Sequence, residues 1–255
     1  MGEEPEKSYQ DINAETIDRW IEEGWEWGQS ISHEDYVNAV NGEWDVVLTP
    51  QKPVPHEWFG ELKGKRVLGL ASGGGQQMPI FAALGAECTV LDYSPRQLES
   101  ERLIAEREGY DIEIIRADMT KPLPFADESF DLIFAPVSTC YIEDVRPLHK
   151  ECARILKDGG VLLGGYDQVV NYIFDDSENT LTYTLPFNPL KDKSQMDMLQ
   201  QGDYGVQFSH TLEEQLGGLI EAGFTITGLY EDMSSDGNLA KHNIPNFYAV
   251  RAQKQ

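Results

Sequence analysis

Short apolar runs alternate with helix-like segments from residue 65 onward, and this alternation constrains the fold most strongly. The runs are RVLGLA, CTVLD, IEIIRA, FDLIFA and GVLLGGY. Helix-like segments at 76–84, 96–108 and 144–157 lie between them. Apolar strands that are joined by helices are typical of a parallel sheet with helices on both faces. The sequence therefore predicts a doubly wound α/β fold.

The C-terminal part adds one helix and two strands to this pattern. The helix TLEEQLGGLIEAGF begins with Thr211 and Glu214 at the spacing of a capping box. The runs TITGLYED and NFYAVRAQ follow it and predict an antiparallel hairpin at the sheet edge. We therefore expect seven strands in a mostly parallel sheet with an antiparallel C-terminal edge strand.

The segments that flank this pattern have other roles. Residues 1–58 combine helix-like spacing of apolar residues with the proline-rich linker TPQKPVP, which predicts an N-terminal helical cap. Ser32 is the expected N-cap of its second helix. Residues 59–255 would form the main domain, in one structural unit with the cap. Within it, 167–210 is too long for a plain connection, so we expect an insertion that acts as a lid.

Composition limits the classes of partner. The chain has 44 Asp and Glu against 20 Lys and Arg, a formal net charge of -24, and no basic patch, which argues against nucleic acid. Cys88, Cys140 and Cys152 have neither disulfide-framework nor metal-site spacing, which favours a reduced cytoplasmic protein. We find no signal peptide and no apolar run long enough to span a membrane. We expect a small-molecule partner and a monomer or homodimer.

Three consecutive glycines, Gly73 to Gly75, follow the first strand in VLGLASGGG. A glycine turn there could serve the fold alone, or it could admit a ligand at the carboxyl end of the strand. Asp92 ends the second strand and could accept hydrogen bonds from both hydroxyls of a ribose. The dinucleotide fingerprint fails because Met78 stands where its third small residue belongs, and no P-loop is present. The sequence thus favours a nucleoside without a pyrophosphate.

Together, VLGLASGGG, LDYS, RADMTKPLPFADESFDLIFA and ECARILKDGGVLLGG resemble a class I S-adenosylmethionine-dependent methyltransferase. The resemblance covers roughly residues 65–166 and is tighter to an uncharacterised bacterial subset of small-molecule type. It implies a Rossmann-like fold, S-adenosylmethionine as cofactor and S-adenosylhomocysteine as product.

The resemblance also implies which residues bind the cofactor. Asp92 would bind the ribose, Tyr93 and Met119 would lie beside the adenine, and Asp118 would accept from its amino group. The remaining implied positions line the methionine and sulfonium portion: Ala71, Gly73, Gly75, Pro136 and Val137.

The chain departs from the family pattern in its first motif. Gly69 stands where the family often has an acid, and Ala71 stands in place of its usual first glycine. Gln76 or Gln77 could hold the amino end of the methionine instead.

The candidates for chemistry at the acceptor are Tyr141, Asp167 and His210. Tyr141 follows the fourth strand, where many relatives touch the acceptor, although packing is the alternative role. Asp167 ends the fifth strand and could be a general base or a loop residue. His210 could be a base or a structural contact at the start of its helix. We expect no metal, because the adjacent Asp-Asn pair of a metal-dependent O-methyltransferase is missing.

Trp20, Trp25 and Trp27 either pack on the sheet or form an aromatic lid over the cofactor, and Trp27 is the one expected to reach it. The function that these observations favour is transfer of a methyl group to N or O of a small molecule. Two alternatives stay open. One is a catalytically weak regulatory or partner subunit that binds the cofactor or its product, and the other is a protein methyltransferase acting on a basic peptide.

Overall fold

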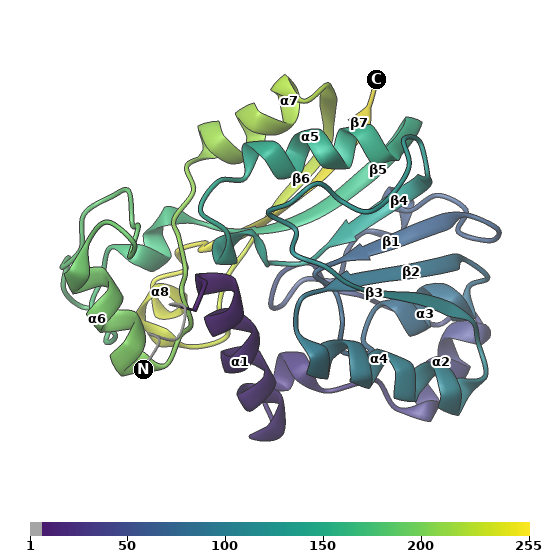
Figure 1. The fold of residues 1–255 in the computed structure, drawn as a ribbon, viewed down its shortest axis with the longest axis horizontal. Coiled ribbons are helices and arrows are strands. Elements are labelled where there is room, and N and C mark those ends of the chain that lie inside the picture. Colours follow the sequence, from purple (N-terminus) through teal and green to yellow (C-terminus); the bar gives the residue numbers. More distant parts are fainter. Residues whose placement is uncertain (1–6) are drawn as a thin grey trace, which may run out of the picture.

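The computed structural model of the protein describes residues 7–255. Its centre is a seven-stranded sheet in the order β3-β2-β1-β4-β5-β7-β6 (Figure 1). Strands β1 to β5 pair in parallel, and β7 pairs antiparallel with both β5 and β6. The strands are β1 Arg66–Leu70, β2 Glu87–Asp92, β3 Ile112–Arg116, β4 Phe130–Ala135, β5 Leu156–Asp167, β6 Phe224–Asp232 and β7 Phe247–Lys254. The predicted mostly parallel seven-stranded sheet is confirmed.

The last two strands form the predicted antiparallel pair at one edge of the sheet. Strand β7 lies between β5 and β6, so β6 is the outermost strand of this pair. The strand order reverses between β1 and β4, which are direct neighbours. In open α/β sheets, a crevice for ligands forms at such a reversal, outside the carboxyl ends of the strands.

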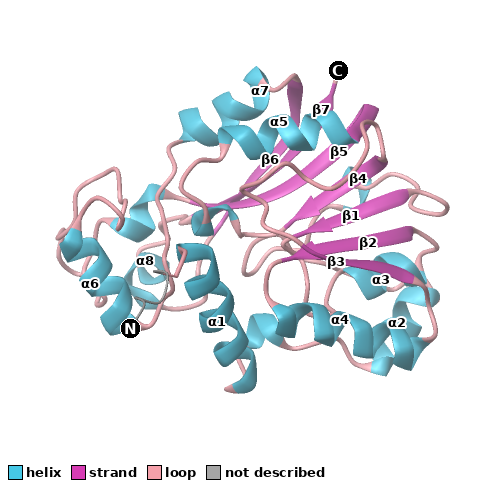
Figure 2. Cartoon of the chain, in the orientation of Figure 1, coloured by secondary structure: helices cyan, strands magenta, loops and turns pink. Residues whose placement is uncertain are grey.

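Helices cover both faces of the sheet (Figure 2). The α-helices are α1 Tyr9–Glu22, α2 His33–Val40, α3 Met78–Ala83, α4 Pro95–Glu108, α5 Arg146–Ile155, α6 Lys193–Gly202, α7 Gly218–Glu221 and α8 Gly237–Lys241. Capping residues explain where several of these helices begin or end. The Ser94 side chain accepts from Gln97 N–H at the start of α4, and Gly109 ends this helix in the left-handed conformation. Ser32 caps α2 as predicted, and Thr211 and Glu214 form the predicted capping box.

Alternation along the strands divides the core into two layers. On β1, Leu68 and Leu70 belong to the layer under α5 and α7, whereas Val67 belongs to the layer under α2 and α3. Successive side chains of a strand point to opposite faces, so a strand that is apolar at every position requires cover on both sides. This is the physical basis of the doubly wound arrangement.

The linker before β1 is part of the core. Leu48 and Val54 are buried in the layer with α2 and α3, and Leu48 C=O accepts from Val137 N–H just beyond β4. The linker approaches β5 so closely that a Cβ atom at Gly165 would lie 2.1 Å from the Leu48 oxygen. The predicted cap and linker therefore pack directly on the main domain.

Helix α1 confirms the helix that the sequence predicted in the N-terminal region, and its most buried side chains are largely polar. Ile12 is exposed, whereas Asn13, Ala14 and Thr16 are buried. Two of these buried side chains are polar, and Asn13 exchanges hydrogen bonds with the backbone of Val206 in the insertion. Contacts with α4 are also polar, because the Ser94 hydroxyl donates to Asp18. Polar groups on the neighbouring surfaces thus determine which face of this helix is buried.

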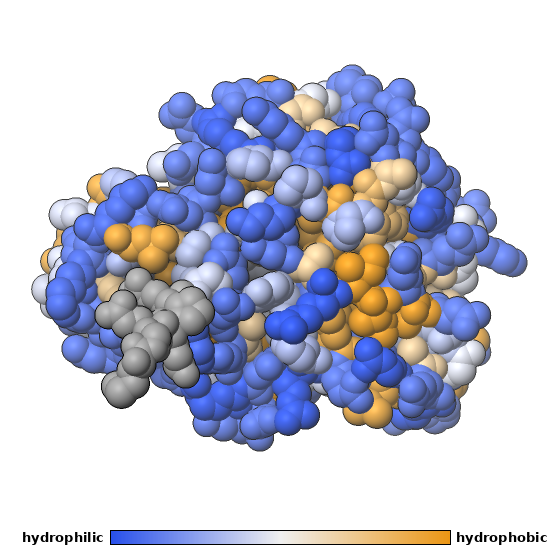
Figure 3. All heavy atoms as spheres, in the orientation of Figure 1, coloured by the Kyte–Doolittle hydropathy of each residue, from blue (hydrophilic) through white to orange (hydrophobic). Residues whose placement is uncertain are grey.

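The insertion 167–210 has a small core of its own. Cys140 from the turn after β4 packs with Tyr172, Phe187 and Leu199 from the insertion. The insertion contains the 3-10 turn Val169–Tyr172 and helix α6, which lies apart from the sheet at the left of Figure 1. On the face drawn in Figure 3, hydrophilic residues predominate and apolar ones gather beside strands β2 and β3. No helix within residues 7–255 is long and apolar enough to cross a membrane.

Candidate active site

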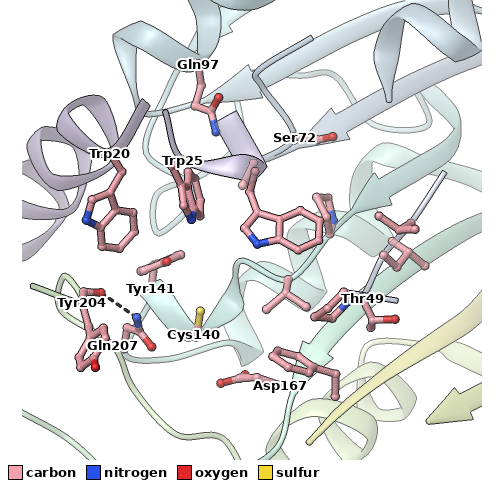
Figure 4. A pocket seen from close by; sticks show the side chains of 18 of the residues that line it. Trp20, Trp25, Thr49, Ser72, Gln97, Cys140, Tyr141, Asp167, Tyr204 and Gln207 are labelled. Atoms are coloured by element: carbon pink, nitrogen blue, oxygen red, sulfur yellow. Dashed lines mark hydrogen bonds between the residues drawn. The ribbon is translucent and has the colours of Figure 1, made fainter. Parts of the chain in front are cut away.

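A cavity of about 780 Å³ lies at the carboxyl ends of β1, β4 and β5. Ala71 after β1, Pro136 after β4 and Asp167 at the end of β5 all line it. Trp20 and Trp25 from the N-terminal region and Tyr204 and Gln207 from the insertion form further parts of the wall (Figure 4). Trp27, Gly202 and Asp203 also line the cavity. The volume lies within the range of small-molecule sites. The cavity thus occupies the place where a doubly wound sheet binds its ligand.

The protein itself occupies the space beside the three glycines. A Cβ atom at Gly73 would lie 2.7 Å from Cβ of Gln97, and one at Gly74 would lie 2.6 Å from Oε1 of the same residue. Packing against helix α4 therefore accounts for the missing Cβ atom at Gly73, which supports the structural one of the two roles that the sequence left open. Gly73 lines the cavity, and Gly75 is not among its lining residues.

All three glycine amides donate to groups of the protein. Gly73 N–H donates to Asp92 Oδ2 at 3.1 Å, Gly74 N–H to the Gln97 carbonyl at 2.9 Å, and Gly75 N–H to Glu101 Oε2 at 2.9 Å. The first and third acceptors are buried carboxylates without a cation beside them in the described chain. Burial raises the pKa of Asp92, and it raises that of Glu101 to about 7.

This end of the cavity presents acceptors to a ligand. Gln97 lines the cavity, is 8% exposed, and its Oε1 is buried without a hydrogen-bond partner. Buried polar atoms are almost always paired, so this oxygen lacks a donor that a ligand would supply. Asp92 lies behind the cavity wall, where its two oxygens accept from Gly73 N–H and Ser94 N–H, so Gln97 is the acceptor at this end for a hydroxyl group of a ribose. The observed residues therefore fit a nucleoside such as S-adenosylmethionine.

The residues expected beside the adenine lie under helix α1. Tyr93 O–H donates to Asp11 Oδ1 at 2.8 Å, and Asp118 Oδ1 accepts from Thr120 N–H at 2.8 Å. Gln10 of α1 donates to the Thr120 hydroxyl. Tyr93, Asp118, Met119 and Asp92 are not among the residues that line the cavity.

The two departures in the first motif have a structural explanation. A side chain at Gly69 would lie 2.8 Å from Sδ of Met78, which is fully buried, so Met78 fills the space of the usual acid. Ala71 adopts φ +48°, a left-handed conformation that glycine accepts more readily. The packing of Met78 thus explains the absence of the acid at Gly69, and Ala71 has a backbone conformation that a glycine would also adopt.

The two glutamines after the glycines both line the cavity. Ser72 O–H donates to Gln77 Oε1 at 3.0 Å, Gln77 Nε2 donates to Gln76 Oε1 at 3.2 Å, and Gln76 Nε2 donates to the Gln29 carbonyl at 2.9 Å. This chain of amides joins the glycine turn to the segment that carries Trp27, which lines the cavity as expected.

The three candidates for chemistry are in different surroundings. Tyr141 and Asp167 line the cavity together with Val137. Burial raises the pKa of Tyr141 well above its ordinary value and raises that of Asp167 to about 6. Asp167 is therefore mostly ionised at neutral pH and can accept a proton.

His210 does not line the cavity. Its Nε2 lies 3.1 Å from the Thr139 carbonyl oxygen and 2.9 Å from that of Ile142, so this nitrogen carries the hydrogen. Burial lowers the pKa of His210. In this position the side chain fixes the turn after β4, and the geometry gives it no contact with a ligand in the cavity.

Sequence reasoning missed many of the cavity residues, among them Gln97, Tyr172 and Gln207. Gln97 lies in the first turn of α4, three residues after the N-cap Ser94. Because α4 starts beside the three glycines, a polar residue in its first turn could have been predicted from the sequence to lie near them. Tyr172 and Gln207 lie in the insertion, where no motif marks them. Tyr172 O–H donates to Asp167 Oδ2.

A mostly parallel sheet with a cavity at its strand-order reversal and a glycine turn beside it defines a protein of Rossmann-like architecture. Comparisons with known proteins identify the family. A family profile described as "Methyltransferase domain" matches residues 68–164. The "Uncharacterized methyltransferase YbaJ" of Bacillus subtilis (strain 168) is 39% identical over 95% of this chain and 97% of its own length.

More distant matches agree. "Methyltransferase phqN" of Penicillium fellutanum is 26% identical over 78% of this chain and 64% of its own. The crystal structure of an S-adenosylmethionine dependent methyltransferase from Mesorhizobium loti has the same fold, with a TM-score of 0.59 and 24% identity over 78% of this chain and 94% of that chain. The chain belongs to the class I S-adenosylmethionine-dependent methyltransferases and is an enzyme of this family.

Proposed function

We propose that this enzyme methylates a nitrogen or oxygen atom of a small organic molecule. When bound, S-adenosylmethionine supplies a methyl group that its sulfonium sulfur has already activated. The residues of this chain hold and orient the reactants, which can account for much of the barrier reduction in such a transfer. Gln97 and the glycine turn would hold the nucleoside end, and Asp167 would accept the proton that the acceptor loses.

The observation that carries this proposal is the unpaired Gln97 Oε1 at the cavity wall, behind which Asp92 supports the glycine turn. The same cavity contains Asp167 on its far side. A binding group and a proton acceptor thus line the same cavity.

Titration calorimetry of the purified protein with S-adenosylmethionine and S-adenosylhomocysteine tests the binding step. The most informative variant is Gln97→Met, because Oε1 has no partner that the substitution would remove. We expect roughly tenfold weaker binding, which corresponds to loss of one hydrogen bond. Asp111→Asn, at an exposed position, is the matched control and should bind as the wild type does.

Failure of the wild type to bind either compound would refute the proposal. A screen of small amines, phenols and alcohols with labelled S-adenosylmethionine then tests the transfer itself. Turnover of any small molecule would exclude the regulatory-subunit alternative, which the Met78 packing against Gly69 already disfavours. Labelling of basic peptides alone would favour the protein-methyltransferase alternative, for which the excess of acidic residues is the supporting observation.

We also propose that the protein acts in the cytoplasm as a monomer or homodimer without a nucleic-acid partner. The three cysteines support a reducing compartment, because all three are buried and unpaired. The net charge of -24 supports the absence of a nucleic-acid partner.

A further inference from the structure

The charged side chains that line the cavity all carry negative charge. They are Glu23, Asp167 and Asp203, and no Lys, Arg or His is among the lining residues. Asp203 already has a cation, because Arg19 forms an ion pair with it. Asp167 has no ion pair within residues 7–255 and is only 5% exposed. A buried carboxylate without a cation is costly, so its position in a ligand cavity indicates that a ligand supplies the cation.

The neighbours of Asp167 orient it and leave it available. Tyr172 O–H donates to Oδ2, and the same hydroxyl lies 3.4 Å from Gln207 Oε1. No other side chain of the described residues donates to the carboxylate. Cys140 and Tyr141 from the turn after β4 and Tyr248 from β7 are the remaining titratable groups that face it, and none of them is a cation.

Aromatic rings form much of the opposite wall. Trp20 and Trp25 lie with ring centroids 5.2 Å apart, and Trp27 and Tyr204 line the same space. In Figure 4, Trp20 and Trp25 lie across the cavity from Asp167. Aromatic faces attract organic cations and also bury their apolar parts.

We propose that the methyl acceptor is an organic amine, which enters as an ammonium with its nitrogen at Asp167 and its apolar body among the tryptophans. This inference rests on the proposed function, since it names the acceptor class for the same cavity. Asp167 then takes one ammonium proton. The N–H bond breaks, its electron pair remains on nitrogen as the lone pair that a methyl transfer requires, and the proton forms an O–H bond on the carboxyl group.

The chemistry of the cavity disfavours the other acceptor classes. A neutral alcohol would leave the charge of Asp167 uncompensated, and a carboxylate would be repelled by it. The burial-raised pKa of Asp167, about 6, keeps the group basic enough to take a proton and acidic enough to release it to water near neutral pH. Tyr172 is a positioning residue, because it acts through Asp167.

The test compares binding of matched probes by calorimetry at pH 7.5 with S-adenosylhomocysteine present. The probes are 2-phenylethylamine, 2-phenylethanol and phenylacetate, and hexylamine against hexanol. We expect each amine to bind at least tenfold more tightly than its alcohol, and phenylacetate to bind weakest. Asp167→Asn should abolish the preference for amines, and Asp111→Asn should preserve it.

A second variant separates a chemical role from a structural one. Tyr172→Phe keeps the charge of Asp167 but removes the hydrogen bond that lowers its pKa. Amine binding should therefore persist, and the pH below which it is lost should shift upward. An unshifted midpoint would show that Tyr172 does not act through Asp167 and would overturn that part of the proposal.

Two results would overturn the amine assignment: equal binding of amines and alcohols by the wild type, or an undiminished amine preference in folded Asp167→Asn. Thermal unfolding of each variant establishes that it is folded. Binding of S-adenosylhomocysteine alone reports on the proposed function separately. If it fails to bind, the same comparison of amines and alcohols is made without it and decides whether the cavity selects amines.

Discussion

Glu101 lies beneath the glycine turn and connects it to the hydrophobic side of α4. The side chain is fully buried, accepts from Gly75 N–H, and receives a second hydrogen bond from the Tyr110 hydroxyl at 3.2 Å. It has no cation within the described residues. A carboxyl group in such surroundings holds the backbone of the turn whether or not it is ionised, but ionisation costs folding free energy.

We predict that Glu101→Gln removes a pH dependence of stability. The pKa of Glu101 is raised from 4.5 to about 7 in the folded state, so the folded protein binds this proton more strongly than the unfolded chain does. The resulting stability is present below pH 4.5 and is lost as the pH rises through 7. Between pH 5 and 8 the wild type should lose roughly 2 to 3 kcal/mol that the variant does not lose.

Urea unfolding of both proteins at pH 5, 6, 7 and 8 measures this difference. The side-chain amide that the substitution introduces would still accept from Gly75 N–H, so the fold should be kept. Parallel stability curves for the two proteins would show that Glu101 does not titrate in this range.

At the scale of elements, the cavity depends on how the linker packs on β5. The segment from Val47 to Pro50 lines the cavity, and Gly165 permits the Leu48 carbonyl to approach the strand. The Leu48 carbonyl belongs to the backbone, so it cannot move aside as the end of a flexible side chain would. Gly165 therefore fixes the position of this part of the cavity wall, although Gly165 itself does not line the cavity.

We expect Gly165→Ala to destabilise the protein and to weaken ligand binding together. Its Cβ atom would lie 2.1 Å from the Leu48 oxygen, and overpacking typically costs about 1–3 kcal/mol. Gly217→Ala is the matched control, because Gly217 has φ -60° and its nearest neighbour would lie 3.7 Å away. In its helical conformation, alanine should stabilise by up to about 1 kcal/mol.

Thermal unfolding and calorimetry with S-adenosylhomocysteine on both variants would check this pair. Unchanged stability and binding in Gly165→Ala would mean that the linker can move away from β5 without consequence for the cavity.

The sequence allowed prediction of those elements whose signals are local. All seven strands, the N-cap Ser32, the capping box of Thr211 and Glu214, and the carboxyl-end position of Asp167 follow from residue order alone. Gln97 and Glu101 were missed because their roles require knowing that α4 packs on the glycine turn. Helix α1 was predicted, but its buried face could not be, because polar partners on α4 and the insertion determine that face and the spacing of its own residues does not reveal them.

At the scale of the whole molecule, buried titratable groups with opposite pH responses lie in different layers. His149 in α5 is 2% exposed, and neither ring nitrogen has a hydrogen-bond partner. Burial lowers its pKa from 6.5 to about 4. Its contribution to stability is present above pH 6.5 and is lost as the pH falls through 4, which is opposite to the response of Glu101.

We predict that His149→Leu protects the protein against acid. Leucine has a similar volume and removes the group whose protonation burial opposes. Between pH 7 and 4.5 the wild type should lose roughly 2 kcal/mol of unfolding free energy that the variant keeps. Urea unfolding at these two pH values measures it, and equal losses in both proteins would contradict the assignment.

The glycine amides have a further consequence for selectivity in the cell. Helix N-termini and glycine turns attract phosphate groups through free backbone N–H donors. Here Gly73, Gly74 and Gly75 direct their amides to Asp92, Gln97 and Glu101. Phosphorylated nucleotides, which are abundant competitors for any nucleoside site, thus find the N–H donors of this turn already occupied. Discrimination against them is built into the contact between the turn and helix α4.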